Sequence, residues 1–275
     1  MRAGVVALLV GAVAAGTLLL VPGQAGPTEM AAKPAAQPGA QPTAQPAVLA
    51  HPVPVTTTAQ ASQPFGGTAA VGALFTLSSG SLGTHFCTAS VVHSAHGDLA
   101  VTAAHCVTGT PGQIVFVPGY ASGQAPYGVW PVTAVYTSPG WQSSQDPDDD
   151  VAFLRLSGAD GVPIEEVTGA EQLDTSHQQP ALVRAIGYPD DTEQPVMCTN
   201  WSRPFSPTQL EFDCDGFPDG TSGGPFLADV SAAGHGTVIG VIGGYQRGGD
   251  TSQVSYASTF GTMVTGLYQS AQAGG

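Results

Sequence analysis

The chain has 275 residues, and its formal net charge at pH 7 is −14 because only six residues are lysine or arginine. This length permits one or two domains with a sizeable core. So few cations cannot neutralise a run of phosphates, which argues against nucleic-acid binding. The acidity is typical of a soluble surface that repels its own copies.

The first 26 residues have the pattern of a secretory signal peptide. Arg2 gives a positive start, residues 5–21 are an apolar run, and small residues around Ala25 offer a cleavage point. The apolar run is also at the short limit for an uncleaved membrane anchor, which is the alternative. We expect cleavage, secretion and no membrane contact of the mature chain.

Residues 27–64 are rich in Ala, Pro, Gln and Thr and contain few large apolar side chains. Such a segment cannot bury a core, so it predicts an extended linker or a pro-segment. The composition changes at Phe65, where we expect the folded domain, residues 65–275, to begin.

From Phe65 onwards, short β-prone runs alternate with turns rich in Gly, Pro, Ser and Asp. Many short strands with regular turn signals predict an all-β sandwich or a pair of barrels. The clearest runs are residues 71–77, 99–102, 114–117, 129–136, 151–156, 181–186, 237–242 and 254–257. Near the end, Phe260, Val264, Leu267 and Tyr268 have the spacing of one apolar helix face.

Four cysteines are an even set that favours disulfides in an exported protein. They permit three connectivities, of which the sequential one closes two loops of modest length. The alternative is a metal site made of Cys87, His105 and Cys106. No C-x-x-C spacing supports that alternative, so we expect no metal.

The stretch DGTSGGP at residues 219–225 contains a candidate nucleophile, Ser222. A hydroxyl needs a base to take its proton and donors to stabilise the oxyanion that forms. Gly220 and Gly223 allow a tight turn that presents the hydroxyl, and the N–H groups of Gly220 and Ser222 are the natural donors. The alternative is a plain loop of glycine and serine.

A base and an orienting carboxylate complete the requirement. His105 ends the apolar run LAVTAAHC, whereas the other histidines lie in polar surroundings. Asp150 closes an acidic run and begins an apolar strand, so it is the aspartate most easily drawn inward. A buried carboxylate bonded to Nδ1–H of a histidine selects the tautomer needed for catalysis. The rest of the acidic run is expected to be a surface loop, since it lacks the spaced ligands of a calcium site.

The motifs TAAHC at 102–106, DVAFLRL at 150–156 and GTSGGP at 220–225 occur in that order. In this order they resemble the chymotrypsin-like (trypsin-fold) serine peptidases, and more narrowly the secreted branch found in actinobacteria. The resemblance covers residues 65–275. It implies two antiparallel six-stranded β-barrels with the site between them and a C-terminal helix.

The resemblance also implies a role for each motif residue. His105 would be the general base and then the acid, Asp150 its orienting partner, and Ser222 the nucleophile. Gly220 and Ser222 would supply the oxyanion hole through their N–H groups.

Two bridges follow from the same resemblance, Cys87–Cys106 beside the histidine and Cys198–Cys214 before the nucleophile. The chain departs from the family at Thr221, where the usual motif has aspartate. In the animal enzymes that aspartate pairs with a freshly cut N-terminal amine. Threonine has no charge, so we expect that this activation does not operate here.

The substrate pocket is expected to lie beside the nucleophile. Counting back from Ser222 places Gly216 at the pocket base, which argues against a strict preference for Lys or Arg, although Asp215 is one residue away. An apolar or aromatic P1 residue is the preferred prediction. The expected pocket residues are Asp215, Gly216, Phe217, Gly243, Gly244 and Tyr245.

These observations predict a secreted, monomeric serine endopeptidase that acts on proteins or peptides through an acyl-enzyme, with no metal and no organic cofactor. One alternative is a catalytically silent homologue that serves as a binding protein. A less favoured one is an esterase or lipase, because the serine motif also fits G-x-S-x-G. That fold needs an acid and then a histidine after the serine, and only His235 follows Ser222.

Overall fold

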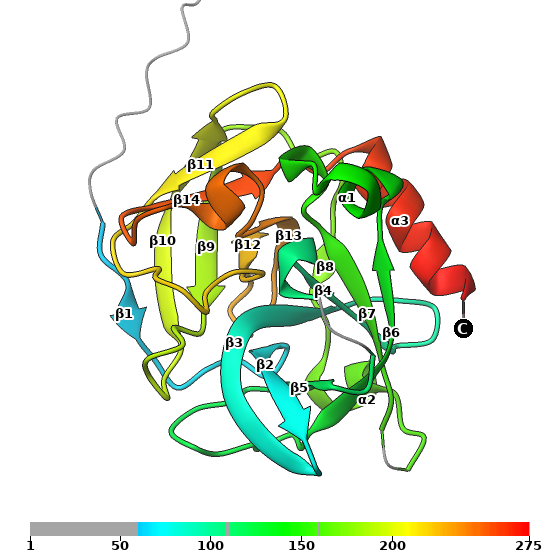
Figure 1. Ribbon diagram of the computed structural model, residues 1–275. Helices are drawn as coiled ribbons and strands as arrows, with labels where there is room; N and C mark the ends of the chain where they lie inside the picture. Colours follow the sequence, from blue (N-terminus) through cyan, green and yellow to red (C-terminus); the bar gives the residue numbers. More distant parts are fainter. Residues whose placement is uncertain (1–59, 108–110, 159, 275) are drawn as a thin grey trace, which may run out of the picture. The chain divides into compact units, whose positions relative to one another are not determined.

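The computed structural model of the protein describes residues 60–107, 111–158 and 160–274 (Figure 1). The expected signal peptide and almost all of the expected linker lie outside the described residues. No described helix is long and apolar enough to cross a membrane.

The first half of the described chain forms a closed antiparallel barrel in the order β2-β3-β4-β7-β6-β5. Its interior is filled by large side chains such as Leu74, Phe116 and Leu154, none of which is exposed. Burial of these apolar surfaces is the main source of the barrel's stability. The strands are β2 (Val71–Ser78), β3 (Ser81–Val92), β4 (Leu99–Thr102), β5 (Ile114–Pro118), β6 (Trp130–Thr137) and β7 (Ala152–Leu156).

The second half forms an eight-stranded sheet among the described residues, in the order β14-β11-β10-β9-β12-β13-β8 with β1 added beside β10. A single bridge between Ile242 and Ala257 joins the end of β13 to β14. The expected all-β fold is confirmed, with the second barrel taking the form of a half-barrel sheet. Its strands are β1 (Gln63–Pro64), β8 (Gln172–Leu173), β9 (Ala181–Gly187), β10 (Val196–Pro204), β11 (Gln209–Asp213), β12 (Pro225–Ala228), β13 (Thr237–Val241) and β14 (Val254–Ser258).

The sheet begins earlier in the chain than the sequence predicts. Residues 63 and 64 pair with Met197 and Val196 of β10, and Ala61 forms a bridge with Asp215. These residues were expected to end the linker. Backbone pairing with an existing sheet edge orders them without an apolar core of their own. The described domain therefore includes residues 60–64.

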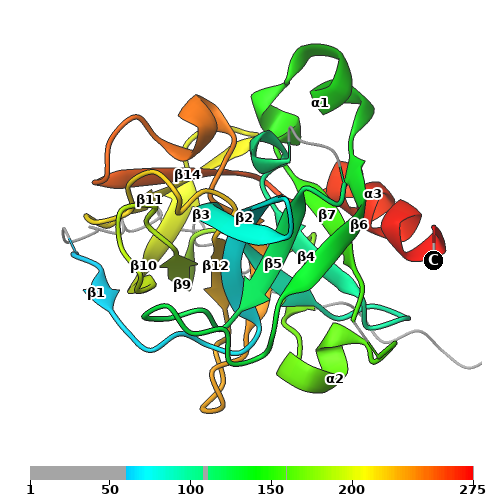
Figure 2. The same cartoon turned by 60° about the horizontal axis from the view of Figure 1, so that its bottom comes forward.

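The predicted C-terminal helix is present as α3 (Thr262–Ala273), which contacts β6 and β7 (Figure 2). Val264 and Ala271 are its buried residues, while Leu267 and Tyr268 are half-buried. Phe260 is buried but precedes the helix. The shorter helices are α1 (Pro139–Ser144), α2 (Ile164–Thr168) and the 3₁₀ turns η1 (Ala104–Cys106), η2 (Pro147–Asp149) and η3 (Tyr245–Gly248).

Both sequential disulfides are formed, Cys87–Cys106 in the first barrel and Cys198–Cys214 in the second sheet. Cys87 lies in β3, and Cys106 ends η1. The first bridge therefore ties the turn that carries His105 to the barrel wall. The second ties β10 to the residue that follows β11.

Candidate active site

His105 and Asp150 are brought together by the register of two strands. The antiparallel pair β4 and β7 matches Thr102 with Ala152, so the end of β4 lies beside the start of β7. His105 follows β4 by three residues, in η1, and Asp150 precedes β7 by two. Residues far apart in the sequence thus meet at one end of the barrel.

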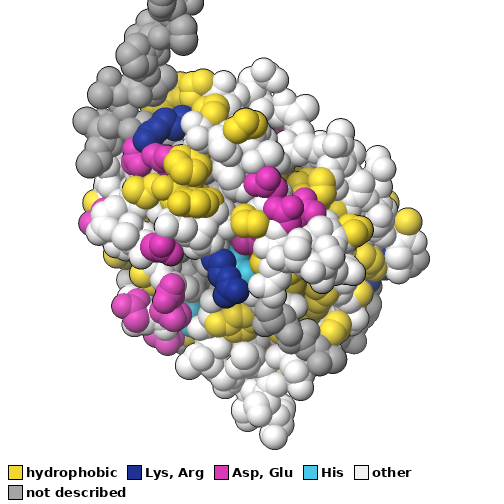
Figure 3. Space-filling model, turned by 45° about the horizontal axis from the view of Figure 1, so that its top comes forward, with side chains coloured by type: hydrophobic (Ala, Val, Ile, Leu, Met, Phe, Trp, Pro, Cys, Tyr) yellow, Lys and Arg dark blue, Asp and Glu magenta, His cyan; other side chains and the backbone are white. Residues whose placement is uncertain are grey.

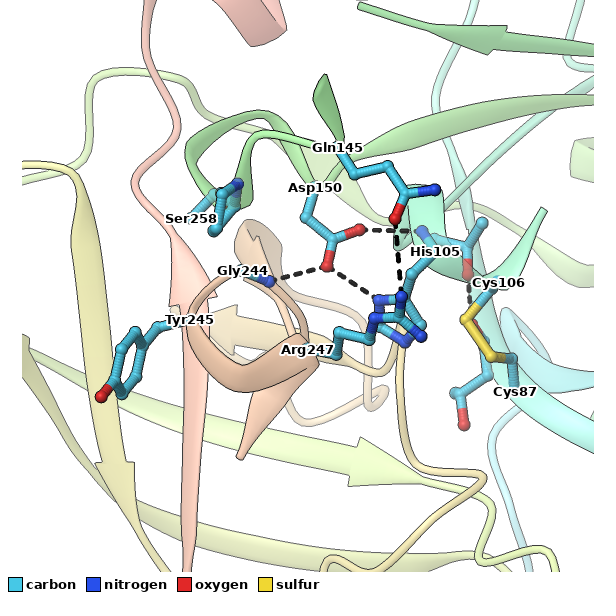
Figure 4. A network of polar contacts seen from close by, with 12 residues as sticks. Cys87, His105, Cys106, Gln145, Asp150, Gly244, Tyr245, Arg247 and Ser258 are labelled. Carbon is cyan, nitrogen blue, oxygen red and sulfur yellow. Dashed lines mark hydrogen bonds and ion pairs between the residues drawn. A yellow bond between two sulfur atoms is a disulfide. The ribbon is translucent and has the colours of Figure 1, made fainter. Parts of the chain in front are cut away.

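The carboxylate of Asp150 contacts the histidine twice. Oδ2 lies 2.7 Å from His105 Nδ1, and Oδ1 accepts the His105 backbone N–H at 2.8 Å. Gly244 N–H donates to Oδ2 at 2.8 Å from the second sheet (Figure 4). Asp150 is 1% exposed, so its charge is buried and stabilised by three donors.

This arrangement assigns the histidine tautomer. An ionised carboxylate only accepts hydrogen bonds, so the Nδ1 atom of His105 carries the proton. Nε2 is then unprotonated in the neutral ring and can accept a proton from a nucleophile. The Asp150–His105 pair therefore has the chemistry of an oriented general base.

The turn that carries Ser222 requires glycine on both sides. Gly220 has φ = +89° and Gly223 has φ = +80°, in the region that favours glycine. A Cβ at position 220 would lie 2.4 Å from the backbone nitrogen of Asp190, and one at 223 would lie 2.1 Å from Thr102 Oγ1. Neither position has room for a side chain. The glycines around Ser222 in the sequence therefore have a steric cause.

Hydrogen bonds from outside this turn fix the carbonyl groups of two of its peptides. Asp190 N–H donates to Asp219 O at 3.0 Å, and Thr88 donates through Oγ1 to Gly220 O at 3.0 Å. Within the described part of the chain, no protein acceptor pairs with the N–H of Gly220 or of Ser222. Both residues line a cavity, so these two N–H groups are available to a ligand oxygen there.

Thr88 is a site residue that the sequence analysis missed. It lies in β3 and is fully buried. Besides donating to Gly220 O, its Oγ1 accepts from Tyr188 N–H at 2.9 Å, and its backbone N–H donates to Ser222 O at 2.7 Å. One residue of the first barrel thus holds two peptide units of the turn that carries Ser222. In the sequence, the only sign that Thr88 lies near the site is its position directly after Cys87.

Thr221 stabilises the turn internally. Its Oγ1 donates to Pro218 O at 2.7 Å, and its N–H donates to the same carbonyl at 3.2 Å. The side chain is 2% exposed and packs over Gly187, where a Cβ would lie 2.6 Å from Thr221 Cβ. A buried aspartate here would need a cationic partner, whereas threonine needs only the nearby carbonyl.

His105, Ser222 and Gly220 line one cavity of about 760 Å³. Among the hydrogen bonds of the described residues, none joins the Ser222 hydroxyl to His105. The structure therefore places the three candidate residues at one site, with the Asp150–His105 link formed. Of the expected pocket residues, Phe217 also lines the cavity.

The other expected pocket residues do not line the cavity. Asp215 accepts hydrogen bonds from Ser252 Oγ at 3.1 Å and Gln253 Nε2 at 3.2 Å, so its carboxylate is engaged elsewhere. Gly216 lies against Ser62, whose Oγ donates to its carbonyl at 3.1 Å. Neither residue lines this cavity. Their part in substrate binding stays a prediction.

Two further expected pocket residues lie against Asp150, and the third packs on other aromatic rings. A Cβ at Gly243 would lie 3.0 Å from Asp150 Oδ2, and Gly244 donates to that oxygen. The Tyr245 ring packs on Phe205 and Tyr256, with centroid distances of 5.1 and 5.0 Å. Gly243 therefore leaves room for the buried carboxylate, and Gly244 supplies it with a donor.

Charged residues of both signs line the cavity, and Figure 3 shows a Lys or Arg side chain close to a histidine on a face with acidic neighbours. Arg247 lies in η3 and extends towards Gln145, with 3.5 Å between Nη2 and Oε1 (Figure 4). Gln246 and Arg247 have φ values of +52° and +53°, which are unusual for residues other than glycine. The acidic lining residues are Asp190, Asp219 and Asp250.

A metal site at Cys87, His105 and Cys106 does not fit the structure. Their potential ligand atoms lie within 4.8 Å of one another. The two sulfur atoms are bonded to each other, so this group lacks the thiolates that zinc requires.

The sequence and structure have clear relatives. Residues 83–241 match the family described as trypsin-like peptidase domain. Among solved structures, the protease Anisep from Arthrobacter nicotinovorans is 26% identical, with a TM-score of 0.66 over 77% of this chain and 99% of that one. No curated protein matches the sequence.

Two further structures share the fold at lower identity. A thermostable serine protease from an extremophilic microorganism is 24% identical, with a TM-score of 0.64 over 76% of this chain and 99% of that one. A Glu endopeptidase in complex with MPD is 15% identical, with a TM-score of 0.61 over 78% of this chain and 97% of that one. The family match covers more than half of the sequence, and the chain belongs to the trypsin-like peptidases.

Proposed function

We propose that this chain is a secreted serine endopeptidase that cleaves proteins or peptides with Ser222 as nucleophile, His105 as general base and Asp150 as its orienting partner. The observation that carries the proposal is the 2.7 Å contact between Asp150 Oδ2 and His105 Nδ1 in the cavity wall that also contains Ser222. A buried carboxylate that fixes a histidine tautomer beside a serine is the arrangement that acyl transfer requires.

The mechanism follows from the positions of the protons. The Ser222 hydroxyl attacks the substrate carbonyl carbon while its proton passes to His105 Nε2. The carbonyl oxygen becomes an oxyanion that can accept hydrogen bonds from the N–H groups of Gly220 and Ser222. His105 then donates its proton to the leaving amine, and the acyl group stays on Ser222. Water, deprotonated by His105, attacks the carbonyl carbon of the acyl-enzyme. The bond to Ser222 Oγ then breaks, His105 returns the proton to Oγ, and the acid is released.

Asp150 acts through His105 rather than on the substrate. When His105 takes the proton of Ser222, it becomes an imidazolium whose Nδ1–H faces a carboxylate. The charge that develops is thereby paired inside the protein. The backbone hydrogen bond from His105 to the other carboxylate oxygen limits rotation of the pair.

Secretion and a bacterial origin within the actinobacterial branch are part of the proposal. The two disulfides suit an oxidising compartment, and the first 26 residues have a signal-peptide pattern. We further propose an apolar or aromatic P1 residue. Apolar lining residues support this preference: Phe86, Phe217, Pro218 and Ile242.

The test is digestion of a peptide library by the exported chain and by its Ser222→Ala variant, read by mass spectrometry. The proposal predicts cleavage by the wild type alone, with apolar residues enriched before the cut. If both proteins are folded and neither cleaves, the silent homologue that acts as a binding protein replaces the enzyme. Cleavage by both proteins would assign the activity to a contaminant.

A further inference from the structure

Asp150 depends on the peptide segment at Gly244 and Tyr245. Gly244 N–H donates to Asp150 Oδ2, the oxygen that also contacts His105 Nδ1. The next N–H in the chain, that of Tyr245, donates to Gln209 Oε1 at 3.0 Å. The Gln209 side chain therefore holds the peptide that follows the Asp150 donor.

The other end of the same amide holds the turn that leads into Asp150. Gln209 Nε2 donates to Pro147 O at 3.1 Å and to Asp148 Oδ1 at 2.7 Å. These residues form η2, which ends immediately before Asp150. A single side chain thus connects the turn before Asp150 with the turn that donates to it.

Gln209 is well placed for this connection. It is the first residue of β11, pairs with Ser258 in β14, and is 4% exposed. Gly244 approaches it closely, because a Cβ at that position would lie 2.3 Å from Gln209 Oε1. The positive φ of +75° at Gly244 fits the same absence of a side chain.

The chemistry of the contacts requires an amide. The oxygen accepts from a backbone N–H, and the nitrogen donates to a carbonyl and to a carboxylate. Glutamate could accept from Tyr245 but could not donate to Pro147 or Asp148 when ionised. Methionine has a similar length but supplies no N–H donor.

We propose that Gln209 is a positioning residue that orients Asp150, and through it His105, by coupling η2 with the segment Gly244–Tyr245. The proposal rests on the proposed function. Gln209 lies outside the three sequence motifs. In this proposal it keeps the Asp150 carboxylate in contact with His105 in the first half of the domain and with Gly244 in the second.

The test compares Gln209→Met and Gln209→Glu with Ser258→Ala as the matched control. Ser258 Oγ donates to the same Pro147 carbonyl at 2.8 Å but does not hold Tyr245. For the Gln209 variants we expect kcat on a peptide substrate to fall about tenfold, as the loss of roughly one hydrogen bond's free energy implies, with KM unchanged. For Ser258→Ala we expect kcat within about twofold of the wild type, because Gln209 still holds both segments.

A second readout does not depend on activity. The low-field proton NMR signal of the His105 Nδ1–H reports its hydrogen bond to Asp150. We expect this signal in the wild type and in Ser258→Ala, and a shifted or broadened signal in both Gln209 variants. If the signal stays the same in folded Gln209 variants, the inference is wrong even when the enzyme is active. An inactive wild type whose signal changes in the Gln209 variants would contradict the proposed function and leave the positioning role supported.

A purely structural role gives a different result. It predicts a lower melting temperature for the Gln209 variants, with unchanged kcat and NMR signal below that temperature. Gln209→Glu keeps the acceptor for Tyr245 N–H. If Gln209→Met does not fold, the same measurements are therefore made on Gln209→Glu. Unchanged kcat in that variant would overturn the proposal.

Discussion

Asp150 holds His105 with both oxygens of one carboxylate, Oδ1 on the backbone N–H at 2.8 Å and Oδ2 on the ring Nδ1 at 2.7 Å. The main chain and the side chain of the histidine are thus fixed by the same buried group. This double contact explains how a residue in a short 3₁₀ turn can present a ring in a defined orientation.

Replacing the Asp150 carboxylate by an amide is expected to abolish the fixed orientation and tautomer of His105. In Asp150→Asn, only one atom can accept a hydrogen bond, and an NH₂ group facing Nδ1 favours the wrong tautomer. We expect kcat to fall by a factor on the order of 10³–10⁴, with little change in melting temperature. Steady-state kinetics with Asp229→Asn, an exposed aspartate, as control measure the effect. Wild-type kcat in Asp150→Asn would contradict the assignment of Asp150.

Thr88 is expected to fix the conformation of the turn that carries Ser222. Thr88→Val removes the donor to Gly220 O and the acceptor of Tyr188 N–H but keeps the shape of the side chain. Because two buried polar groups lose their partner, we expect kcat to fall roughly ten- to a hundredfold with KM nearly constant. Thr88→Ser keeps the hydroxyl and should retain most of the activity. Equal losses in both variants would show that packing, rather than the hydroxyl, is what matters.

The contact between His105 and Asp150 could be anticipated from sequence because both residues stand at the ends of recognisable strands. LAVTAAHC and DVAFLRL are apolar strands that end and begin beside a polar residue. Strands with mixed polarity were missed, such as β3 (Ser81–Val92) and β10 (Val196–Pro204). These strands are stabilised by their neighbours in the sheets rather than by a continuous apolar run.

The residues that support the site had no local signal. Thr88 contacts Gly220 across 132 positions, and Gln209 contacts Tyr245 across 36. A threonine or glutamine in a strand is ordinary in sequence, and only the tertiary structure shows what it bonds. Likewise, nothing in the sequence indicated the contacts of Asp215, whose side chain accepts hydrogen bonds from Ser252 and Gln253.

A buried glutamate links stability to pH away from the site. The Glu171 side chain is fully buried and lies 3.5 Å from His235 Nδ1. Burial raises the pKa of Glu171 above its ordinary value of 4.5, while the hydrogen bond from Gly236 N–H and the nearby His235 oppose the shift. A raised pKa means that the folded state favours the protonated acid. Its stabilising contribution is present below the ordinary pKa and is lost as pH rises through the folded-state value.

The variant Glu171→Gln removes this dependence while keeping an acceptor for Gly236 N–H. We expect the melting temperature of the variant minus that of the wild type to increase as pH rises from about 4 to 7. Thermal unfolding across this range measures it. A difference that decreases with pH would mean that the charged form is the stabilised one.

The N-terminal segment of the domain is expected to support substrate binding. Ser62 N–H donates to Asp215 O at 2.7 Å, Asp215 N–H donates to Gln60 O at 2.8 Å, and Ser62 Oγ donates to Gly216 O. These contacts hold the chain that leads into Phe217 in the cavity wall. We expect a chain that begins at residue 65 to show a KM raised by about tenfold, as the loss of one or two hydrogen bonds implies.

The matched control is a chain that begins at Gln60, which should bind substrate like the full exported protein. The milder variant Ser62→Ala removes only the side-chain contact and should raise KM by a smaller factor. Identical KM values for the chains that begin at 60 and 65 would show that residues 60–64 are dispensable for binding.

The most direct measurement is covalent labelling of the protein with a fluorophosphonate, followed by mass spectrometry of the digested product. Ser222 Oγ attacks phosphorus, fluoride leaves, and His105 takes the proton, so only an activated serine reacts rapidly. We predict one label on the peptide that contains Ser222, no label there in Ser222→Ala, and much slower labelling in His105→Ala. A folded wild-type protein that takes up no label at Ser222, or that reacts equally fast without His105, would contradict the proposed catalytic site.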